Sequence, residues 1–248
     1  MRRMSRRLVI PIVVVAVVTA ASYLYLSYGH SNARALQVFS WFRDKDSRPD
    51  LMMQAGTRCN EASFIFPTDG LIGFLWDDSF RFGHRHQGID IFGGQGVGVT
   101  RVIAAYPGYL SRLPDWKSSV IVRVPDDPLH PARQIWLYYT HMADKDGQSY
   151  ISSEFPAGTT DTWIEAGTTL GYQGNYSGDP FNPVGVHLHF SIVESDLLGR
   201  FKNELDIENT IDPSQYLGLP LNGRENPSEI PTCEEVWVGH IEGRLGFG

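Results

Sequence analysis

Short runs of β-branched and aromatic residues, interrupted by glycine and proline, dominate the chain between Phe64 and Val193. Such runs are typical of β-strands, and Gly and Pro mark the turns between them. The 25 glycines and 15 prolines also disfavour long helices here. The strands that we expect lie at residues 88–92, 102–106, 120–124, 135–139, 169–172 and 187–193. The sequence therefore predicts an all-β fold, an antiparallel sandwich or a barrel-like domain.

Composition and charge narrow the class of protein. With 248 residues, 42% of them hydrophobic, the chain can bury a substantial core. The net charge is −7, and it falls to about −11 when the arginines at positions 2, 3, 6 and 7 are set aside. Nucleic-acid binding needs clustered Lys and Arg, so we expect no nucleic-acid partner.

The N-terminus predicts export. A basic segment at residues 1–7 precedes an apolar stretch, and Leu8 to Leu26 carries no charge. Four arginines before such a stretch predict a cytoplasmic N-terminus, a membrane-spanning signal anchor or signal peptide at 8–28, and an extracytoplasmic remainder. Cleavage near Ala33-Arg-Ala35 would give a secreted protein instead of a single-pass membrane protein. A buried core helix is the third reading of this stretch.

The rest of the chain divides by composition. Residues 29–57 are polar and irregular, and we interpret them as a juxtamembrane linker with one short helix around Leu36–Phe42. The folded domain is expected at 58–219, followed by a proline-containing tail at 220–248 that packs back through Cys233. Position alone suggests the further hypothesis that the linker occludes a cleft of the domain.

Cys59 and Cys233 are the two cysteines of the chain. In an oxidising compartment they could form an intramolecular disulfide that joins the start of the domain to its end. Closing so long a loop could contribute about 5 kcal/mol. The alternative is a pair of buried thiols that act as small apolar side chains.

Two histidines stand one residue apart in the run Gly185-Val-His-Leu-His-Phe-Ser-Ile-Val193. In a strand, residues two apart project from the same face, so His187 and His189 would face one common space. One imidazole could bind a metal ion while the other reaches what the ion holds. The alternative is two structural histidines that hydrogen-bond to neighbouring groups.

A second cluster reads His86-Gln-Gly-Ile-Asp90. A regular strand would hold His86 about 13 Å from Asp90, too far for one ion, but Gly88 permits a turn or bulge that folds the pair inward. With one histidine of the later pair they would supply three N and O ligands. Three protein ligands with one open position are typical of a catalytic zinc site.

A third element, Trp136-Leu-Tyr-Tyr-Thr-His-Met142, is a strand that ends in His141. If this strand neighbours the metal, His141 and the second histidine of the later pair could flank a water molecule at the open position. Imidazoles placed there could take the proton of that water or stabilise charge on a carbonyl oxygen.

These motifs resemble those of the lysostaphin-type (LytM-like) zinc metallopeptidases, peptidoglycan endopeptidases with the duplicated hybrid motif fold. The family carries His-x-x-x-Asp, then Tyr-x-His-Leu, then His-x-His-Phe, and the corresponding segments here are His86-Gln-Gly-Ile-Asp90, Tyr139-Thr-His-Met142 and His187-Leu-His-Phe190. The resemblance extends from about Phe66 to Leu217. It implies one zinc ion held by His86, Asp90 and His189, with His141 and His187 as the catalytic histidines.

The chain departs from the family pattern at two places. Met142 replaces the commoner leucine, and we expect it to be tolerated as a packing residue. The segment from Tyr176 to Pro183 is longer than the short Gly-rich turn of the family, so the loop at 176–186 is expected to shape one wall of the cleft.

Other histidines and acids receive weaker assignments. His84 lacks the four-residue spacing to Asp90 and is expected at the rim of the site. His130 and His240 lie outside every motif and carry no assignment. Three aspartates are interpreted as turn residues and not as ligands: Asp69, Asp77 and Asp78.

The resemblance thus implies a zinc metalloendopeptidase that acts outside the cytoplasm on stem or cross-bridge peptides of peptidoglycan. The alternative is a non-catalytic regulatory member of the same fold that activates another cell-wall hydrolase. A third possibility is an exported β-domain with a structural zinc, which would require a fourth protein ligand.

Overall fold

A computed structural model describes residues 6–78 and 84–233, without the side chains of residues 6–13 and 24–33. Most of the basic segment expected at 1–7 lies outside these residues. The end of the tail, including His240, lies outside them as well.

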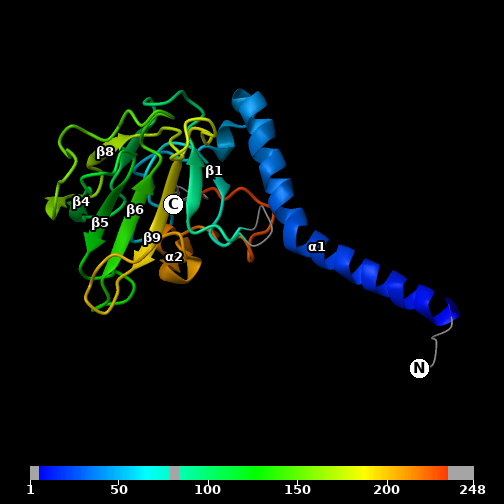
Figure 1. Ribbon diagram of the computed structural model, residues 1–248. Coiled ribbons are helices and arrows are strands. Elements are labelled where there is room, and N and C mark those ends of the chain that lie inside the picture. Colours follow the sequence, from blue (N-terminus) through cyan, green and yellow to red (C-terminus); the bar gives the residue numbers. More distant parts are fainter. Residues whose placement is uncertain (1–5, 79–83, 234–248) are drawn as a thin grey trace, which may run out of the picture.

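Within the described residues, the strands form one large antiparallel sheet and one small sheet (Figure 1). The large sheet has the order β1 (Leu71–Phe74), β2 (Ile89–Phe92), β9 (Leu188–Glu194), β6 (Ile135–Thr140), β5 (Val120–Val124), β4 (Gly108–Ser111) and β7 (Thr162–Ile164), and β10 (Thr210–Ile211) also pairs with β9. The small sheet pairs β3 (Arg101–Ile103) with β8 (Thr169–Tyr172). The predicted antiparallel β class is confirmed.

Each of the six expected runs overlaps a strand, and two of them, 120–124 and 169–172, match the strand bounds. Four further strands, β1, β4, β7 and β10, were not expected. They have two to four residues each, too few for the alternation of apolar and polar positions to be recognised in the sequence.

Alternation along the central strands separates the core from the opposite face of the large sheet. The core takes Ile89 and Ile91 from β2, Leu188, Phe190 and Ile192 from β9, and Leu137 and Tyr139 from β6. Because successive side chains of a strand point to opposite faces, the residues between them emerge on the other face. Asp90, His189, Tyr138 and Thr140 therefore lie together, outside the core.

Helix α1 (Arg6–Arg43) is far longer than the short helix expected at Leu36–Phe42. It extends away from the sheets at its N-terminal end, and its C-terminal part runs beside β1 (Figure 1). Val38 and Trp41 pack there against Leu71 and Phe92. The apolar spacing of Val38 and Trp41 along one helix face explains why this part of the expected linker docks on the sheet.

Short helices complete the fold. The chain continues from α1 through the 3-10 helices η1 (Lys45–Ser47) and η2 (Pro49–Leu51). A third, η3 (Ile207–Asn209), precedes β10, and helix α2 (Ser214–Leu217) follows it.

Residues 8–28 are helical as part of α1. Among the residues that the structure describes, however, no helix combines the length and the apolar character needed to span a membrane. The membrane span expected at 8–28 is not supported by this finding.

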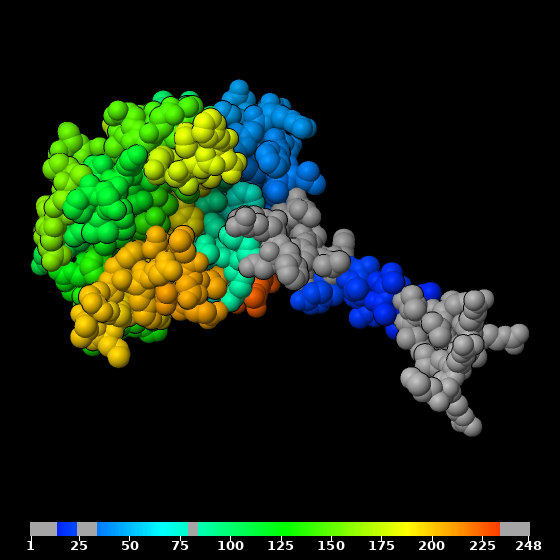
Figure 2. All heavy atoms as spheres, in the orientation of Figure 1, coloured from blue at the N-terminus to red at the C-terminus, as the bar shows by residue number. Residues whose placement is uncertain are grey.

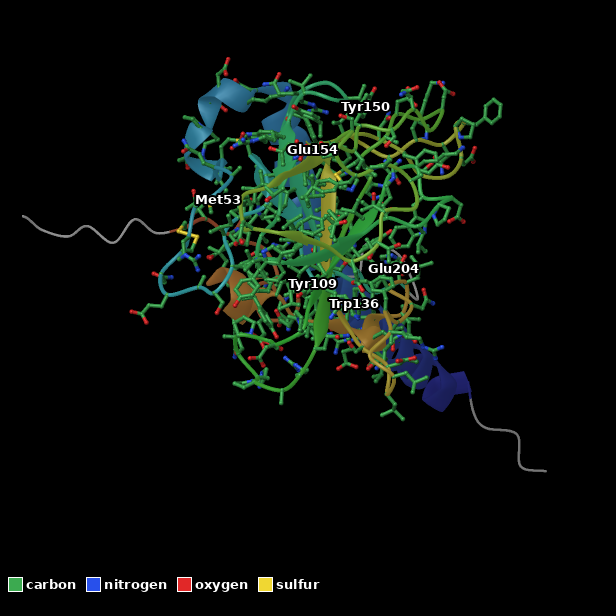
Figure 3. The ribbon with its side chains drawn as sticks, turned by 90° about the vertical axis from the view of Figure 1, so that its left-hand side faces the viewer. Met53, Tyr109, Trp136, Tyr150, Glu154 and Glu204 are labelled. Carbon is green, nitrogen blue, oxygen red and sulfur yellow. A yellow bond between two sulfur atoms is a disulfide. The ribbon has the colours of Figure 1, made fainter. Side chains whose placement is uncertain are left out.

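Cys59 and Cys233 form the predicted disulfide, with their Cα atoms 5.4 Å apart. The bond lies near Met53 (Figure 3), whose sulfur accepts a hydrogen bond from the Cys233 N–H. The described part of the tail packs on the domain, and Leu221 within it is fully buried. The disulfide thus links Cys233 to the start of the expected domain at Cys59.

Candidate metal centre

Three neighbouring strands of the large sheet build the centre. His189 of β9 pairs in register with Asp90 of β2 on one side and with Thr140 of β6 on the other. His86 lies just before β2, His141 just after β6 and His187 just before β9. The sheet therefore brings all five residues predicted from the sequence to one place.

The three expected ligands converge. His86 Nε2 lies 3.1 Å from His189 Nδ1, and Asp90 Oδ1 lies 3.2 Å from His86 Nε2 and 2.9 Å from His189 Nδ1. Within the described chain this is the group of His, Cys, Asp and Glu side chains that could hold a metal ion, and it contains no fourth such residue.

Hydrogen bonds outside the cluster orient both ligand rings. The Leu75 carbonyl can only accept, so His86 Nδ1 donates to it at 2.8 Å and leaves a lone pair on Nε2. His189 Nε2 lies 2.8 Å from Ser191 Oγ, which can accept its proton and leave a lone pair on Nδ1. Metal-binding histidines are commonly held in this manner through their second nitrogen.

The donor set fits zinc. Two imidazoles and one carboxylate form a usual ligand set for catalytic Zn²⁺, with bond lengths of about 2.0–2.2 Å. Ligand atoms of a tetrahedral site are then about 3.3–3.5 Å apart, close to the 2.9–3.2 Å found here. Two lone pairs and a carboxylate that face one another at these distances are stabilised by a cation between them.

His141 and His187 lie beside the ligands, with their ring centres 4.5 Å apart. His141 Nδ1 donates to the Tyr176 carbonyl and His187 Nδ1 to the Gly185 carbonyl, each at 2.6 Å. These contacts orient both rings, and Nε2 of His187 lies 3.4 Å from Asp90 Oδ1. His141 has φ of 69°, a left-handed backbone conformation that is uncommon outside glycine and often occurs at functional sites.

Burial and charge set the protonation of the centre. Burial, aided by the neighbouring His187 and His189, lowers the pKa of His141 to about 3. Burial also lowers the pKa of His189. Burial alone would lower the pKa of His86, but the Asp90 carboxylate outweighs it and raises that pKa. His141 and His189 are therefore neutral at neutral pH, and a bound cation would favour the neutral, metal-ligating form of His86.

Gly88 allows the close packing of β2 against β9. A Cβ at this position would lie 2.3 Å from the Phe190 carbonyl oxygen, 2.5 Å from Ser191 Oγ and 3.0 Å from His189 Nε2. Sequence reasoning assigned Gly88 to a bend between His86 and Asp90, and the chain does bend there. The structure adds a second role, since only glycine leaves space for the ring of His189.

A cavity of about 440 Å³ opens over the centre. Its walls include Tyr176, Ser177 and Val184 from the 176–186 loop, as expected, and Glu204 and Leu205 from the segment before η3. Figure 2 shows the surface hollowed between the yellow and orange segments to which these two walls belong. Glu204 is labelled in Figure 3.

Hydroxyl groups line the cavity beside the histidines. Ser119 Oγ lies 2.7 Å from Thr140 Oγ1 and 3.3 Å from the Tyr138 hydroxyl. Sequence reasoning missed these groups and Ser191. The period of two along β6 and β9, which placed His187 and His189 on one face, would also have indicated Tyr138, Thr140 and Ser191.

The structure also shows where the histidines and aspartates outside the three motifs lie. The ring centre of His84 lies 6.4 Å from that of His86, and His130 lines no part of the cavity. The three aspartates bind other groups: Asp69 accepts from the Ala55 N–H, Asp77 pairs with Arg85 and Arg224, and Asp78 pairs with Arg34. None of them joins the ligand cluster.

The sequence matches no protein-family model and no curated protein. Solved structures are similar. The catalytic domain of the antimicrobial peptidase lysostaphin from Staphylococcus simulans is 17% identical, with a TM-score of 0.38 over 60% of this chain and 89% of that domain. The catalytic domain of the prophage-encoded M23 protein EnpA from Enterococcus faecalis is 19% identical, with a TM-score of 0.37 over 60% of this chain and 95% of that domain.

The longer lysostaphin chain is 14% identical, with a TM-score of 0.37 over 67% of this chain. This chain spans 55% of its length. The chain is similar to the lysostaphin-type M23 peptidases, the family that its three sequence motifs resemble.

Proposed function

We propose that the protein is a zinc-dependent metalloendopeptidase that hydrolyses peptide bonds in peptidoglycan. The observation that carries this proposal is the convergence of His86, Asp90 and His189, with no fourth protein ligand among the residues that the structure describes, beside two further histidines in an open cavity. A closed structural site would use four protein ligands, so this arrangement favours catalysis.

His86, Asp90 and His189 would hold the ion. Zinc bound there would polarise the scissile carbonyl and lower the pKa of a water molecule. The chain's own contribution begins with the hydrogen bonds from His86 to Leu75 and from His189 to Ser191, which fix the ligand rings. No large rearrangement of the ligands is then needed when substrate arrives.

His141 and His187 act on protons and on developing charge. His141 is neutral and presents Nε2 as a lone pair, so it can accept the proton of the attacking water at that atom. His187 Nε2 lies beside Asp90, and an N–H at that atom would donate a hydrogen bond to the oxygen on which negative charge develops. The carbonyls of Tyr176 and Gly185 hold the two rings in position for these steps.

We propose that the domain acts outside the cytoplasm, where peptidoglycan is found. The Cys59–Cys233 disulfide supports this location, because such bonds persist in oxidising compartments and are rare in the cytosol. A regulatory protein without catalysis is the alternative function. Nothing in the site favours it, since all five chemical positions are present and face the cavity.

Hydrolysis of purified peptidoglycan by the full-length protein tests the proposal. Zinc-loaded wild type should release new amino termini, and a chelator should stop the reaction. His141→Ala should retain zinc but lose at least about 100-fold in kcat, the typical contribution of a proton-transferring residue. Full activity of this variant would overturn the role of His141, and an inactive zinc-loaded wild type would favour the regulatory function.

A further inference from the structure

We propose that Arg34 and Asp78 are positioning residues for the metal ligand His86, and that docking of α1 is thereby coupled to metal binding. The inference rests on the proposed metal centre. It concerns a helix that the sequence indicated to be part of a linker, yet Arg34 in that helix is fully buried.

Arg34 joins three parts of the chain. Its Nε lies 3.3 Å from Asp78 Oδ2, its Nη1 donates to the Glu229 carbonyl at 2.7 Å, and its Nη2 donates to the Asn226 carbonyl. Asp78 is 2% exposed. Two charges buried this deeply must remain paired, because an isolated one would be strongly destabilising. The pair therefore fixes α1 and the tail against the segment that contains Asp78.

Hydrogen bonds connect Asp78 to the metal ligand His86, both directly and through Leu75. Asp78 Oδ2 accepts from the Leu75 N–H at 2.7 Å, and the Asp78 N–H donates to the Leu75 carbonyl at 3.2 Å. That same carbonyl accepts from His86 Nδ1, while the Asp78 carbonyl accepts from the His86 N–H at 2.9 Å. The Leu75–Asp78 turn thus holds both the backbone and the ring of His86.

Helix α1 reaches the other side of the centre through aromatic rings. The ring of Phe42 contacts that of Phe92 edge to face, with the ring centres 5.5 Å apart. The ring of Phe92 stacks on that of His187, with the ring centres 5.1 Å apart. Gly73 permits this packing, because a Cβ there would lie 2.6 Å from the Phe92 ring and 2.9 Å from Val38. One helix therefore supports both a metal ligand and a neighbouring histidine.

Coupling of this kind is reciprocal. If docked α1 increases the affinity for zinc, bound zinc must stabilise docked α1 by the same factor. Loss of Arg34 would leave the Asp78 carboxylate buried without its partner, and the Leu75–Asp78 turn would shift to relieve it. We expect zinc affinity to fall about tenfold, the lower end of the loss seen when groups behind a metal ligand are removed.

Zinc dissociation constants of the full-length protein, measured by competition with a chelator, test the proposal. Arg34→Met should bind zinc about tenfold more weakly, and Arg34→Lys should recover part of the loss because it keeps a charge opposite Asp78. Gln37→Ala is the matched control, since Gln37 lies on the same helix and bonds to the Ser228 carbonyl but not to Asp78. It should bind zinc like wild type.

The absorption spectrum of bound Co²⁺ separates positioning from a general loss of stability, because it reports ligand geometry. The spectrum of Arg34→Met should differ from those of wild type and Gln37→Ala. A folded Arg34→Met with wild-type affinity and spectrum would overturn the proposal. Failure of wild type to bind zinc would instead refute the proposed metal centre.

Hydrogen exchange of the wild type gives a test that does not depend on a folded variant. Zinc should slow amide exchange at residues 34–43 of α1 more than in β7, which lies at the far end of the large sheet. Equal protection of both segments, or none at α1, would show that helix docking and metal binding are independent.

Discussion

Gly88→Ala should damage the metal centre without altering any chemical group in it. The added Cβ would lie 2.3 Å from the Phe190 carbonyl oxygen, whereas close carbon–oxygen contacts are about 3.3 Å. Relief requires β2 and β9 to separate locally by about 1 Å, and it moves the His189 ring, whose Nε2 would lie 3.0 Å from the new carbon. Insertion of a methyl group into packed structure typically costs about 1–3 kcal/mol.

This cost can be measured in two ways. For a chain of this size, 1–3 kcal/mol corresponds to a fall in Tm of about 2–12 °C. Zinc affinity should also fall, by about tenfold or more, because the ligand ring is displaced from its position. Thermal unfolding of the metal-free protein gives the first quantity, and chelator competition gives the second.

Gly96→Ala is the matched control. A Cβ at Gly96 would meet no atom within 4 Å, and its backbone is not left-handed, so both quantities should remain unchanged. A Gly88→Ala variant that unfolds and binds zinc like wild type would refute the proposed packing of β2 against β9 at the centre.

Two further predictions concern stability. Burial would raise the pKa of Asp127, but hydrogen bonds from a backbone N–H, a tyrosine and an arginine outweigh it and lower this pKa. Ionised Asp127 therefore stabilises the folded state above the unfolded pKa of about 3.9, and this stabilisation is lost as pH falls through the folded pKa. Asp127→Asn should therefore cost about 1–3 kcal/mol at pH 7 in urea unfolding and less below pH 4, whereas exposed Asp126→Asn should change little; equal losses at both pH values would contradict this. Cys59→Ser/Cys233→Ser should lose up to about 5 kcal/mol for a separation of 174 residues, and reductant should destabilise wild type but not this variant.

The candidate site could be predicted from the sequence because its signals are local. His187 and His189 are related by the period of a strand, and His86 and Asp90 are separated by four residues around a glycine. Strand pairing then placed both groups in register, since Asp90 lies opposite His189. The two local patterns and the pairing of β2 with β9 are therefore sufficient to bring the ligands together.

The role of α1 could not be predicted in the same way. Arg34 lies in a polar segment, and its partner Asp78 looks like an ordinary turn residue in the sequence. Only the tertiary structure brings the two charges together, so no window of sequence contains the signal. The short strands β1 and β7 were missed for a related reason, because pairing with neighbouring strands and not their own pattern defines them.

Zinc content of the purified full-length protein tests the central claim most directly, with wild type, His189→Ala and His187→Ala measured side by side after metal has been supplied. The account predicts about one zinc per chain in wild type and in His187→Ala, and loss of zinc in His189→Ala. Absence of zinc from wild type, or its retention by His189→Ala, would contradict the assignment of His86, Asp90 and His189 as the metal ligands.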